Sequence, residues 1–266
     1  MRYAIIGSGG FISTRHVQAI CDTGGQVVLT CDIDESKNSD FTNYRDMFQS
    51  KKFKEEVDAV VICTPNFLHR QMIIDALATN RKVLCEKPLI LGNNFEGLDG
   101  VLVVLQLRYH DFIPDIKKAL KKKNNEIEII MKVYRDQKWW DSWRGDPKKS
   151  GGILIGLGIH LFDLIIFLLG NEYFILESKK SRKKCTGIIS FPTATVKYHI
   201  EVLDSREGQT RDIIVNGKKF MLCNKDNLSF SGYHSQVYRD FIKGNGIPLS
   251  EARKSIELVL KLKKYR

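Results

Sequence analysis

The amino-acid sequence predicts a doubly wound α/β domain in its first third, and two observations indicate it. Short runs of purely apolar residues, without alternating polar positions, are typical of parallel strands that are buried on both faces. Stretches of helical character separate these runs, as the crossover connections of a parallel sheet require. The expected strands span residues 3–6, 26–31, 59–63 and 82–85, with helices at 15–20 and 67–78.

The composition is that of a globular chain. Among its 266 residues, 42 Lys and Arg face 31 Asp and Glu, which gives a net charge of +11, and 43% are hydrophobic. This length leaves room for one large or two modest domains, and the composition excludes collagen-like, low-complexity and coiled-coil classes. The positive charge is compatible with nucleic acid, an acidic membrane surface or an anionic small molecule, and composition does not choose among them.

The spacing of the cysteines and the apolar stretches indicate in which cellular compartment we expect the protein. The six cysteines show neither zinc-site spacing nor the density of a disulfide-stapled domain, so we expect reduced thiols, no metal and a cytoplasmic protein. The apolar start is too short for a signal peptide and breaks at Gly7. Residues 152–169 resemble a membrane span but contain His160 and Asp163. Because charges are costly in lipid, a helix buried in protein is the expectation.

A glycine-rich turn joins the first expected strand to the first helix. The turn consists of Gly7, Gly9 and Gly10, followed by Phe11 and Ile12. Backbone amides in such a turn can hold a pyrophosphate when no side chain blocks its approach. Ile12 stands in place of the third glycine of the common dinucleotide-binding fingerprint, so the interpretation as a dinucleotide site depends on the strand–turn–helix context. An ordinary glycine turn is the alternative. Asp32 ends the next strand, where a carboxylate binds ribose hydroxyls and repels a 2′-phosphate, which predicts NAD.

Polar motifs follow the next two strands, at the edge of the sheet where ligands bind in open α/β folds. One reads Thr64-Pro65-Asn66-Phe67-Leu68-His69 and the other Glu86-Lys87-Pro88. Further along, residues 142–152 read Ser-Trp-Arg-Gly-Asp-Pro-Lys-Lys-Ser-Gly-Gly, and residues 156–163 read Gly-Leu-Gly-Ile-His-Leu-Phe-Asp.

In this order, the glycine turn and the three motif regions resemble the Gfo/Idh/MocA family of NAD(P)-dependent sugar and inositol dehydrogenases, over nearly the whole chain. Within that family, residues 104–110, 142–150 and 158–164 look most like UDP-N-acetylglucosaminuronate 3-dehydrogenases of bacterial surface polysaccharide biosynthesis. The resemblance implies NAD-dependent oxidation of the C3 hydroxyl of this nucleotide sugar by a homo-oligomer, a dimer or tetramer. Another sugar or inositol dehydrogenase, or a non-catalytic sensor of NAD and sugar, is the alternative.

The resemblance also implies two domains. Residues 1–107 are expected to form a Rossmann NAD-binding domain. Residues 108–266 are expected to form an α+β substrate-binding and oligomerisation domain with an open, mostly antiparallel sheet, whose terminal helix packs back on the first domain. The sequence agrees, with strands at 127–134, 186–191, 195–203, 211–215 and 218–222, a hairpin turn at Asn216-Gly217 and a helix at 250–262.

Lys87 and His160 are the expected catalytic residues. Oxidation of a secondary alcohol needs a base for the hydroxyl proton and a donor that holds the developing alkoxide. We assign His160 as the base, because its pKa suits proton exchange near neutrality, and Lys87 as the polarising donor. Exchanged roles or a relay remain open. Asp163 shares a helical face with His160 and is the candidate to orient its ring, with a structural ion pair as the alternative.

The resemblance assigns the remaining site residues. The cofactor set comprises Gly7, Gly9, Gly10, Phe11, Ile12, Asp32, Thr64, Pro65, Asn66, His69, Glu86, Lys87 and Gln106. The substrate set comprises Lys87, Arg144, Lys148, Lys149, Ser150, Gly156, His160 and Asp163. The cations of residues 144–150 suit a diphosphate and a carboxylate, and an exposed basic loop is the alternative.

Three features depart from these patterns. The family usually carries Asp or Asn four residues before the histidine, and this chain has Gly156, so a slower enzyme, one that uses a water, or a non-catalytic protein is expected. The connections 34–58 and 88–101 are short for the family, and three glycines make the second a poor helix. Basic runs at 117–123 and 179–184 have no recognised nucleic-acid module beside them, so we expect neither a nucleic-acid nor a membrane partner.

Overall fold

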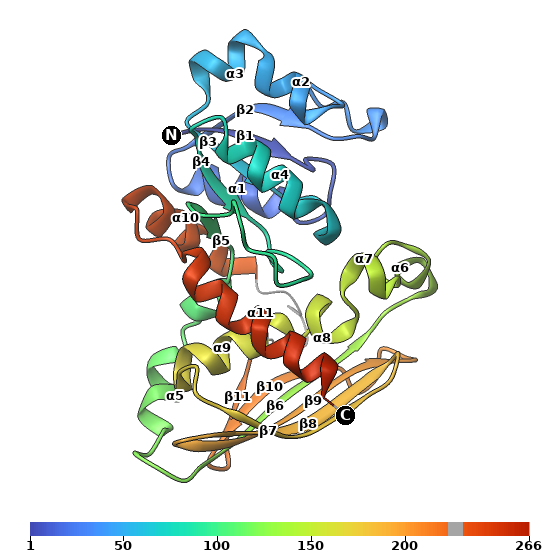
Figure 1. Cartoon of the computed structure of the whole chain (residues 1–266), viewed down its shortest axis with the longest axis vertical. Helices are drawn as coiled ribbons and strands as arrows, with labels where there is room; N and C mark the ends of the chain where they lie inside the picture. Colours follow the sequence, from blue (N-terminus) through green and yellow to red (C-terminus); the bar gives the residue numbers. More distant parts are fainter. Residues whose placement is uncertain (223–230, 266) are drawn as a thin grey trace. The chain divides into compact units, whose positions relative to one another are not determined.

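The computed structural model describes residues 1–222 and 231–265 (Figure 1). They form two compact units, each with its own sheet. The first unit comprises Met1–Ile90, Asn94–Gln106 and Ser231–Arg253, and the second comprises Leu91–Asn93, Leu107–Phe230 and Lys254–Arg266.

The first unit contains a five-stranded parallel sheet in the order β2-β1-β3-β4-β5. Its strands are β1 Arg2–Ile6, β2 Gln26–Cys31, β3 Ala59–Ile62, β4 Lys82–Cys85 and β5 Val101–Val103. The four apolar runs of the sequence are confirmed as strands, while the three-residue β5 was not predicted. From β1 the chain continues to β2 on one side, and from β3 it continues to β4 and β5 on the other side. The residues that follow β1 and β3 therefore lie at the topological switch point of the sheet, where ligands of doubly wound folds bind.

The helices of this unit come from both ends of the chain. They are α1 Ser13–Asp22, α2 Tyr44–Gln49, α3 Lys51–Glu56, α4 His69–Leu77, α10 His234–Lys243 and the first residues of α11 Leu249–Lys264, with a 3₁₀ turn at Asn66–Leu68. The connection from β4 to β5 contains turns and no helix, as its three glycines predicted. Helix α10 packs on α1, and the ring of Tyr238 meets that of Tyr3 edge-on at 5.5 Å.

A C-terminal segment also extends the edge of this sheet. The Val103 amide donates to the carbonyl of Ile247 at 2.9 Å, and Leu102 forms an antiparallel bridge with Pro248. The sequence-based domain limits, 1–107 and 108–266, placed Ser231–Arg253 in the second domain, whereas the structure groups it with the first unit. The remainder of α11 belongs to the second unit.

The second unit contains a six-stranded mixed sheet in the order β11-β10-β6-β9-β8-β7. Its strands are β6 Asn125–Tyr134, β7 Phe174–Lys180, β8 Lys184–Phe191, β9 Ala194–Leu203, β10 Thr210–Val215 and β11 Lys218–Met221. Only β6 and β9 pair in parallel, so the expected open, mostly antiparallel sheet is confirmed. Burial alternates along β6 and β9, which is the pattern of strands covered on one face.

An apolar helix covers the inner face of this sheet. The helices of the unit are α5 Ile113–Ala119, α6 Gln137–Asp141, α7 Pro147–Ser150, α8 Ile153–Gly156 and α9 Ile159–Leu169. The Phe162 ring of α9 meets the Tyr198 ring of β9 edge-on at 5.3 Å. The stretch 152–169 is thus two helices buried in protein, as predicted, and among the described residues no helix has the length and apolarity to span a membrane.

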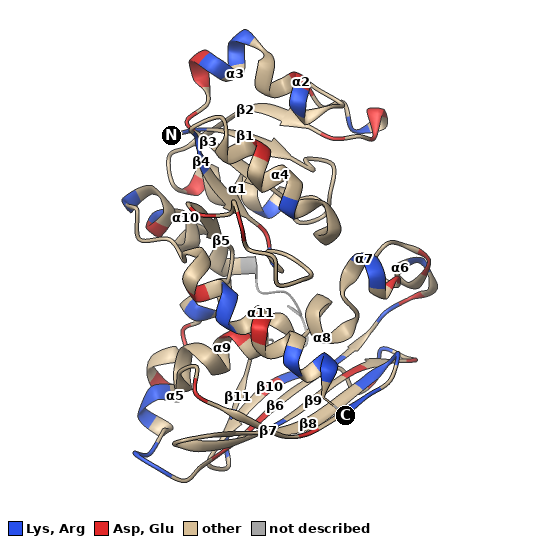
Figure 2. Ribbon diagram, viewed as in Figure 1, with Lys and Arg blue, Asp and Glu red and all other residues tan. Residues whose placement is uncertain are grey.

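Positive charge is spread over helices of both units, with acidic residues among it (Figure 2). The two basic runs of the sequence include surface ion pairs with nearby acids. Lys118 pairs with Asp115 at 3.5 Å, and Lys179 with Glu177 at 3.1 Å. These pairs balance one lysine of the first run and part of the charge of the second.

Candidate active site

The glycine turn lies between the ends of β2 and β3. Gly7 has φ of +83°, and a Cβ there would lie 2.9 Å from the backbone of Cys63 and Thr64, so only glycine fits. The amides of Gly7 and Ser8 both donate to the carbonyl of Cys31, at 2.8 and 3.2 Å. The turn is therefore fixed at the switch point of the sheet and leads into α1, as a dinucleotide site requires. Phe11 is exposed and Ile12 half-buried beside it.

Asp32 faces this turn from the end of β2. Its Oδ2 accepts the Gly9 amide at 2.8 Å, and its Oδ1 accepts the Asp34 amide at 3.0 Å. The side chain of Lys37 lies against Gly9, where a Cβ would approach its Cγ to 2.3 Å. A half-exposed carboxylate beside a glycine turn is the arrangement that binds the ribose hydroxyls of NAD.

His69 links the two polar motifs at the strand ends. Its ring is buried, with Nδ1 at 2.8 Å from the Pro88 carbonyl and Nε2 at 2.8 Å from the Thr64 carbonyl. Burial lowers the pKa of His69, against the hydrogen bonds to Thr64 and Pro88, which raise it. Within this unit His69 therefore holds two loops together, and a contact of its own with the cofactor stays a prediction. Neighbouring Asn66 is buried in the 3₁₀ turn.

Glu86 and Lys87 follow β4 and differ in exposure. Lys87 is half-buried, and its amide donates to Glu86 Oε2 at 3.0 Å. Glu86 is buried and contacts two histidines, His16 and His234, which the sequence analysis did not single out. They lie 218 residues apart along the chain, since 234 − 16 = 218, so no local pattern joins them. Only the fold brings them to the Glu-Lys-Pro motif.

Gln106 is the last cofactor candidate of the first unit. Its side chain is buried, and among the described residues its Oε1 accepts no hydrogen bond. Such a group is costly unless a ligand or water supplies a donor. Together with the glycine turn and Asp32, this orphaned acceptor fits a bound dinucleotide, which carries both hydroxyl and amide donors.

In the second unit His160 lies in the first turn of α9 and is buried. Asp163, one turn on, forms a bidentate ion pair with Arg108, with Oδ2 2.9 Å from Nε and Oδ1 2.7 Å from the terminal NH₂ group. The structural alternative for Asp163 is therefore observed, and a role in substrate binding stays a prediction. Lys87 and His160 belong to different units.

The basic segment 144–150 forms a local cap and turn. Ser150 is buried, and its hydroxyl donates to the Asp146 carbonyl at 2.9 Å and accepts the Gly152 amide at 3.1 Å. The guanidinium of Arg144 lies 4.8 Å from the ring centroid of Trp143. Lys148 and Lys149 are exposed on α7, so this segment presents cations on a turn that its own hydrogen bonds fix.

The sequence analysis missed two further arginines of this unit. Burial, and then the charges of Arg211 and Arg144, lower the pKa of Arg135 to about 10. Among the described residues Arg135 Nε is buried without a hydrogen-bond partner. Arg135 also lines a cavity of about 300 Å³ together with Tyr134, Asp136, Gln137, Trp140, Arg182, Lys183 and Asp204. Arg135 follows β6 and Arg211 lies in β10, so sequence spacing carries no signal for this pair.

Gly156 ends α8 beside Ser150. A Cβ at this position would lie 3.7 Å from the Ser150 carbonyl oxygen, at ordinary contact distance. The surroundings therefore accept the Cβ of a larger residue at this position.

Comparison with known proteins agrees with this fold. A model of the Gfo/Idh/MocA oxidoreductase family, its NAD-binding Rossmann fold, matches residues 1–105. A second model, the C-terminal alpha/beta domain of the same family, matches residues 125–239. The fold is thus that of an NAD-binding Rossmann domain and the C-terminal alpha/beta domain of an oxidoreductase family. The chain belongs to the Gfo/Idh/MocA family, as its motifs predicted.

Individual relatives are more distant. Glucose-6-phosphate 3-dehydrogenase of Bacillus subtilis is 29% identical over 208 residues, covering 68% of this chain and 57% of the relative. The chain spans about half the length of the curated relatives it matches. The WlbA (WbpB) dehydrogenase of Thermus thermophilus with NAD and α-ketoglutarate is 26% identical, with a TM-score of 0.88 over 100% of this chain and 96% of that one. Its complex with NAD and UDP-GlcNAcA has a TM-score of 0.85, at 26% identity, over 99% and 94%.

Proposed function

We propose that the chain is an NAD-dependent sugar dehydrogenase that oxidises the C3 hydroxyl of UDP-N-acetylglucosaminuronic acid, in the supply of sugars for bacterial surface polysaccharides. The observation that carries this proposal is its likeness over the full chain to a dehydrogenase crystallised with NAD and UDP-GlcNAcA. We further propose a cytoplasmic homo-oligomer, whose state light scattering would measure.

The cationic groups of the second unit support an anionic substrate. Burial, and then the charges of Arg211 and Arg144, lower the pKa of Arg135, and a bound anion would offset both effects on this guanidinium. Guanidinium groups bind phosphate and carboxylate through paired hydrogen bonds, and this nucleotide sugar carries both groups. Lys148 and Lys149 add exposed charge on α7.

The mechanism we propose assigns one task to each residue. NAD, held by the glycine turn and Asp32, would supply the acceptor for the hydride of the substrate carbon. His160 accepts the hydroxyl proton, and the Lys87 ammonium donates a hydrogen bond to the oxygen as its negative charge develops. Asp32 accepts hydrogen bonds from the ribose hydroxyls and repels a 2′-phosphate.

The test is turnover. Wild-type protein with NAD and UDP-N-acetylglucosaminuronic acid should produce the absorbance of reduced cofactor, and Lys87→Ala and His160→Ala should each lower kcat by about 100-fold or more. Lys52→Ala, on the exposed face of α3, is the control and should leave kcat unchanged. Full turnover in both catalytic variants would refute the assigned roles.

Two alternatives rest on specific observations. The likeness to glucose-6-phosphate 3-dehydrogenase favours a different sugar, so glucose 6-phosphate and inositol belong in the same assay. Gly156 favours a non-catalytic sensor, because it provides no side chain where the family resemblance implies Asp or Asn. Tight binding of NAD and the nucleotide sugar in calorimetry, with no reduced cofactor formed, would establish the sensor.

A further inference from the structure

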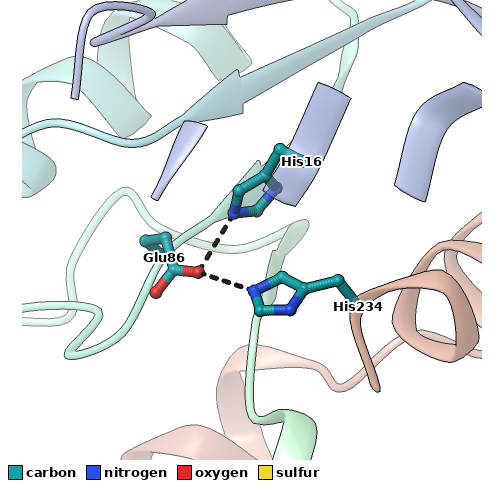
Figure 3. Close-up of side chains that lie close together, drawn as sticks. All are labelled: His16, Glu86 and His234. Carbon is teal, nitrogen blue, oxygen red and sulfur yellow. Dashed lines mark hydrogen bonds and ion pairs between the residues drawn. The ribbon is translucent and has the colours of Figure 1, made fainter. Parts of the chain in front are cut away.

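A buried cluster of two histidines and one carboxylate lies in the first unit, beside the Glu-Lys-Pro motif (Figure 3). His16 comes from α1, Glu86 follows β4, and His234 is the first residue of α10. Glu86 Oε1 lies 3.0 Å from His16 Nε2 and 3.6 Å from His234 Nε2. The two imidazole rings meet edge-on with centroids 5.2 Å apart. One carboxylate oxygen thus faces two rings from different helices.

The hydrogen bonds of the cluster are consistent with a neutral His16 and an ionised Glu86. Burial raises the pKa of Tyr238 well above its usual value, so its hydroxyl is protonated and donates to His16 Nδ1 at 2.8 Å. The ring then donates from Nε2 to Glu86, and burial lowers the pKa of His16 in agreement. Burial by itself would raise the pKa of Glu86, but the hydrogen bond from His16 and the neighbouring His234 hold it well below its usual range.

The second carboxylate oxygen of Glu86 accepts a hydrogen bond from the next residue, Lys87. Because Oε1 is fixed by the histidines, the orientation of the carboxylate is set, and Oε2 accepts the Lys87 amide at 3.0 Å. On the far side of Lys87, the carbonyl of Pro88 contacts His69 at 2.8 Å. The backbone is therefore held at the Lys87 amide and again at the Pro88 carbonyl, one residue further on, which restricts where the ammonium of Lys87 can reach.

We propose that His16, Glu86 and His234 form a positioning cluster for Lys87, through which helix α10, near the end of the chain, sets the backbone of a residue that follows β4. This inference rests on the proposed function only for the catalytic task of Lys87. A bound metal is not needed to explain the cluster, because a proton already joins His16 to Glu86. The claim is that the cluster acts on Lys87 and not only on the stability of the unit.

The first measurement is the reactivity of Lys87 itself, which needs no turnover. Wild type, Glu86→Gln and Tyr238→Phe are labelled with acetic anhydride at several pH values, and peptide mass spectrometry reports each lysine. We expect both variants to change the rate and pH profile of labelling at Lys87, with Glu86→Gln the stronger, and to leave Lys148 and Lys149 unchanged. Tyr238→Phe removes only one hydroxyl, so it keeps the test usable where Glu86→Gln does not fold.

Tyr44→Phe is the matched control. It removes another tyrosine hydroxyl of the same unit, which donates to Asp75 at 2.7 Å. Among the described residues, no hydrogen bond joins Tyr44 or Asp75 to the Glu86 cluster. It should lower the melting temperature as Tyr238→Phe does, without changing the labelling of Lys87. In assays of turnover, Glu86→Gln should lower kcat by about tenfold or more with a smaller change in the Kd of NAD, because misplaced catalytic groups cost rate rather than binding.

Three outcomes decide the proposal. Changed labelling of Lys87 in Glu86→Gln and Tyr238→Phe, but not in Tyr44→Phe, supports it, even when wild type turns over no sugar and the proposed function fails. Unchanged labelling in folded variants overturns it and leaves a cluster that only stabilises the unit. One equivalent of transition metal in the purified wild-type protein, lost in Glu86→Gln, also overturns it and makes the cluster a metal site.

Discussion

Arg108 and Asp163 form a bidentate ion pair in which both side chains are almost fully buried, with 8% and 1% of their surface exposed. Each of these buried charges is stabilised by the other, because removing one partner leaves a buried charge without compensation. The pair ties the turn at Gln106–Tyr109 to helix α9, which carries His160.

Asp163→Asn should therefore lower the free energy of unfolding by about 3 kcal/mol, which is the usual cost of leaving a buried charge unpaired. Urea unfolding measures it. Replacing both partners with apolar residues, Arg108→Met with Asp163→Leu, should recover most of the loss. Asp115→Asn, in an exposed pair with Lys118, is the control and should change stability by less than about 0.5 kcal/mol. An equal loss at both aspartates would contradict the prediction.

Gly156→Asn should raise kcat with the nucleotide sugar by about two- to tenfold, the equivalent of one added hydrogen bond to the substrate. The expected gain depends on the open space at this position, where a Cβ meets its nearest neighbour at 3.7 Å. Steady-state kinetics and a melting curve check it together.

Gly158→Ala provides the contrast two residues on. Its Cβ would lie 2.7 Å from the Leu154 carbonyl oxygen, so we expect a loss of about 1–3 kcal/mol from overpacking. If Gly156→Asn were as destabilising as Gly158→Ala, the asparagine side chain would not fit at this position. The lack of Asp or Asn at position 156 would then not explain slow turnover.

Asp32→Ala should weaken NAD binding by about tenfold or more and reduce the preference for NAD over NADP, because hydrogen bonds to a charged group are lost along with its repulsion of a phosphate. Calorimetry with both cofactors measures the change. Asp40→Ala is a suitable control, since that carboxylate accepts from Thr30 and not from the glycine turn. An unchanged cofactor preference in Asp32→Ala would remove this residue from the ribose site.

The pH dependence of stability provides a test at His110. Its Nδ1 accepts the Phe112 amide at 3.2 Å, and its Nε2 faces the Leu222 carbonyl at 3.4 Å, an arrangement for a neutral ring. Burial lowers the pKa of His110, against the bond to Leu222 and the charge of Asp111, which raise it. Because the pKa of His110 is lower in the folded state than in the unfolded state, its contribution to the free energy of unfolding is complete above about pH 6.5. This contribution falls as the pH drops toward the folded pKa.

His110→Asn should therefore reduce the loss of stability between pH 7 and pH 5, because asparagine offers an acceptor in place of Nδ1 and does not titrate. Chemical unfolding at several pH values provides the comparison. His199, half-exposed beside Glu201, is the control position, and His199→Asn should leave most of the loss in place. A loss in His110→Asn as steep as in wild type would contradict the assignment.

Local sequence was sufficient for the central parallel strands and for the glycine turn. Strands such as Ala59–Ile62 are apolar throughout because both faces are covered, and Gly7 is required by a close approach of backbone to backbone. The six-residue helices α2 and α3 and the three-residue β5 have too few residues to establish a period, so they were not predicted.

Only part of the candidate site could be predicted from the sequence. Asp32 and Lys87 follow strands, so their place at the edge of the sheet follows from topology. His234 and Arg211 acquire their neighbours from distant parts of the chain, and only the folded structure brings them beside Glu86 and Arg135. Asp163 was assigned a helical neighbour by spacing, yet a residue 55 positions away forms its ion pair.

The segment Ser231–Arg253 has a consequence for how the protein is made. It supplies His234 to the Glu86 cluster and Ile247 to the edge beyond β5, so the first unit needs residues translated after almost all of the second. During synthesis the ribosome will have released the whole mixed sheet before the nucleotide-binding unit has all of its parts. A nascent chain stopped at Gln106 holds the glycine turn and Asp32 but lacks α10 and the strand-edge partner. Complete folding of the cofactor unit must therefore wait until Ser231–Arg253 has been synthesised.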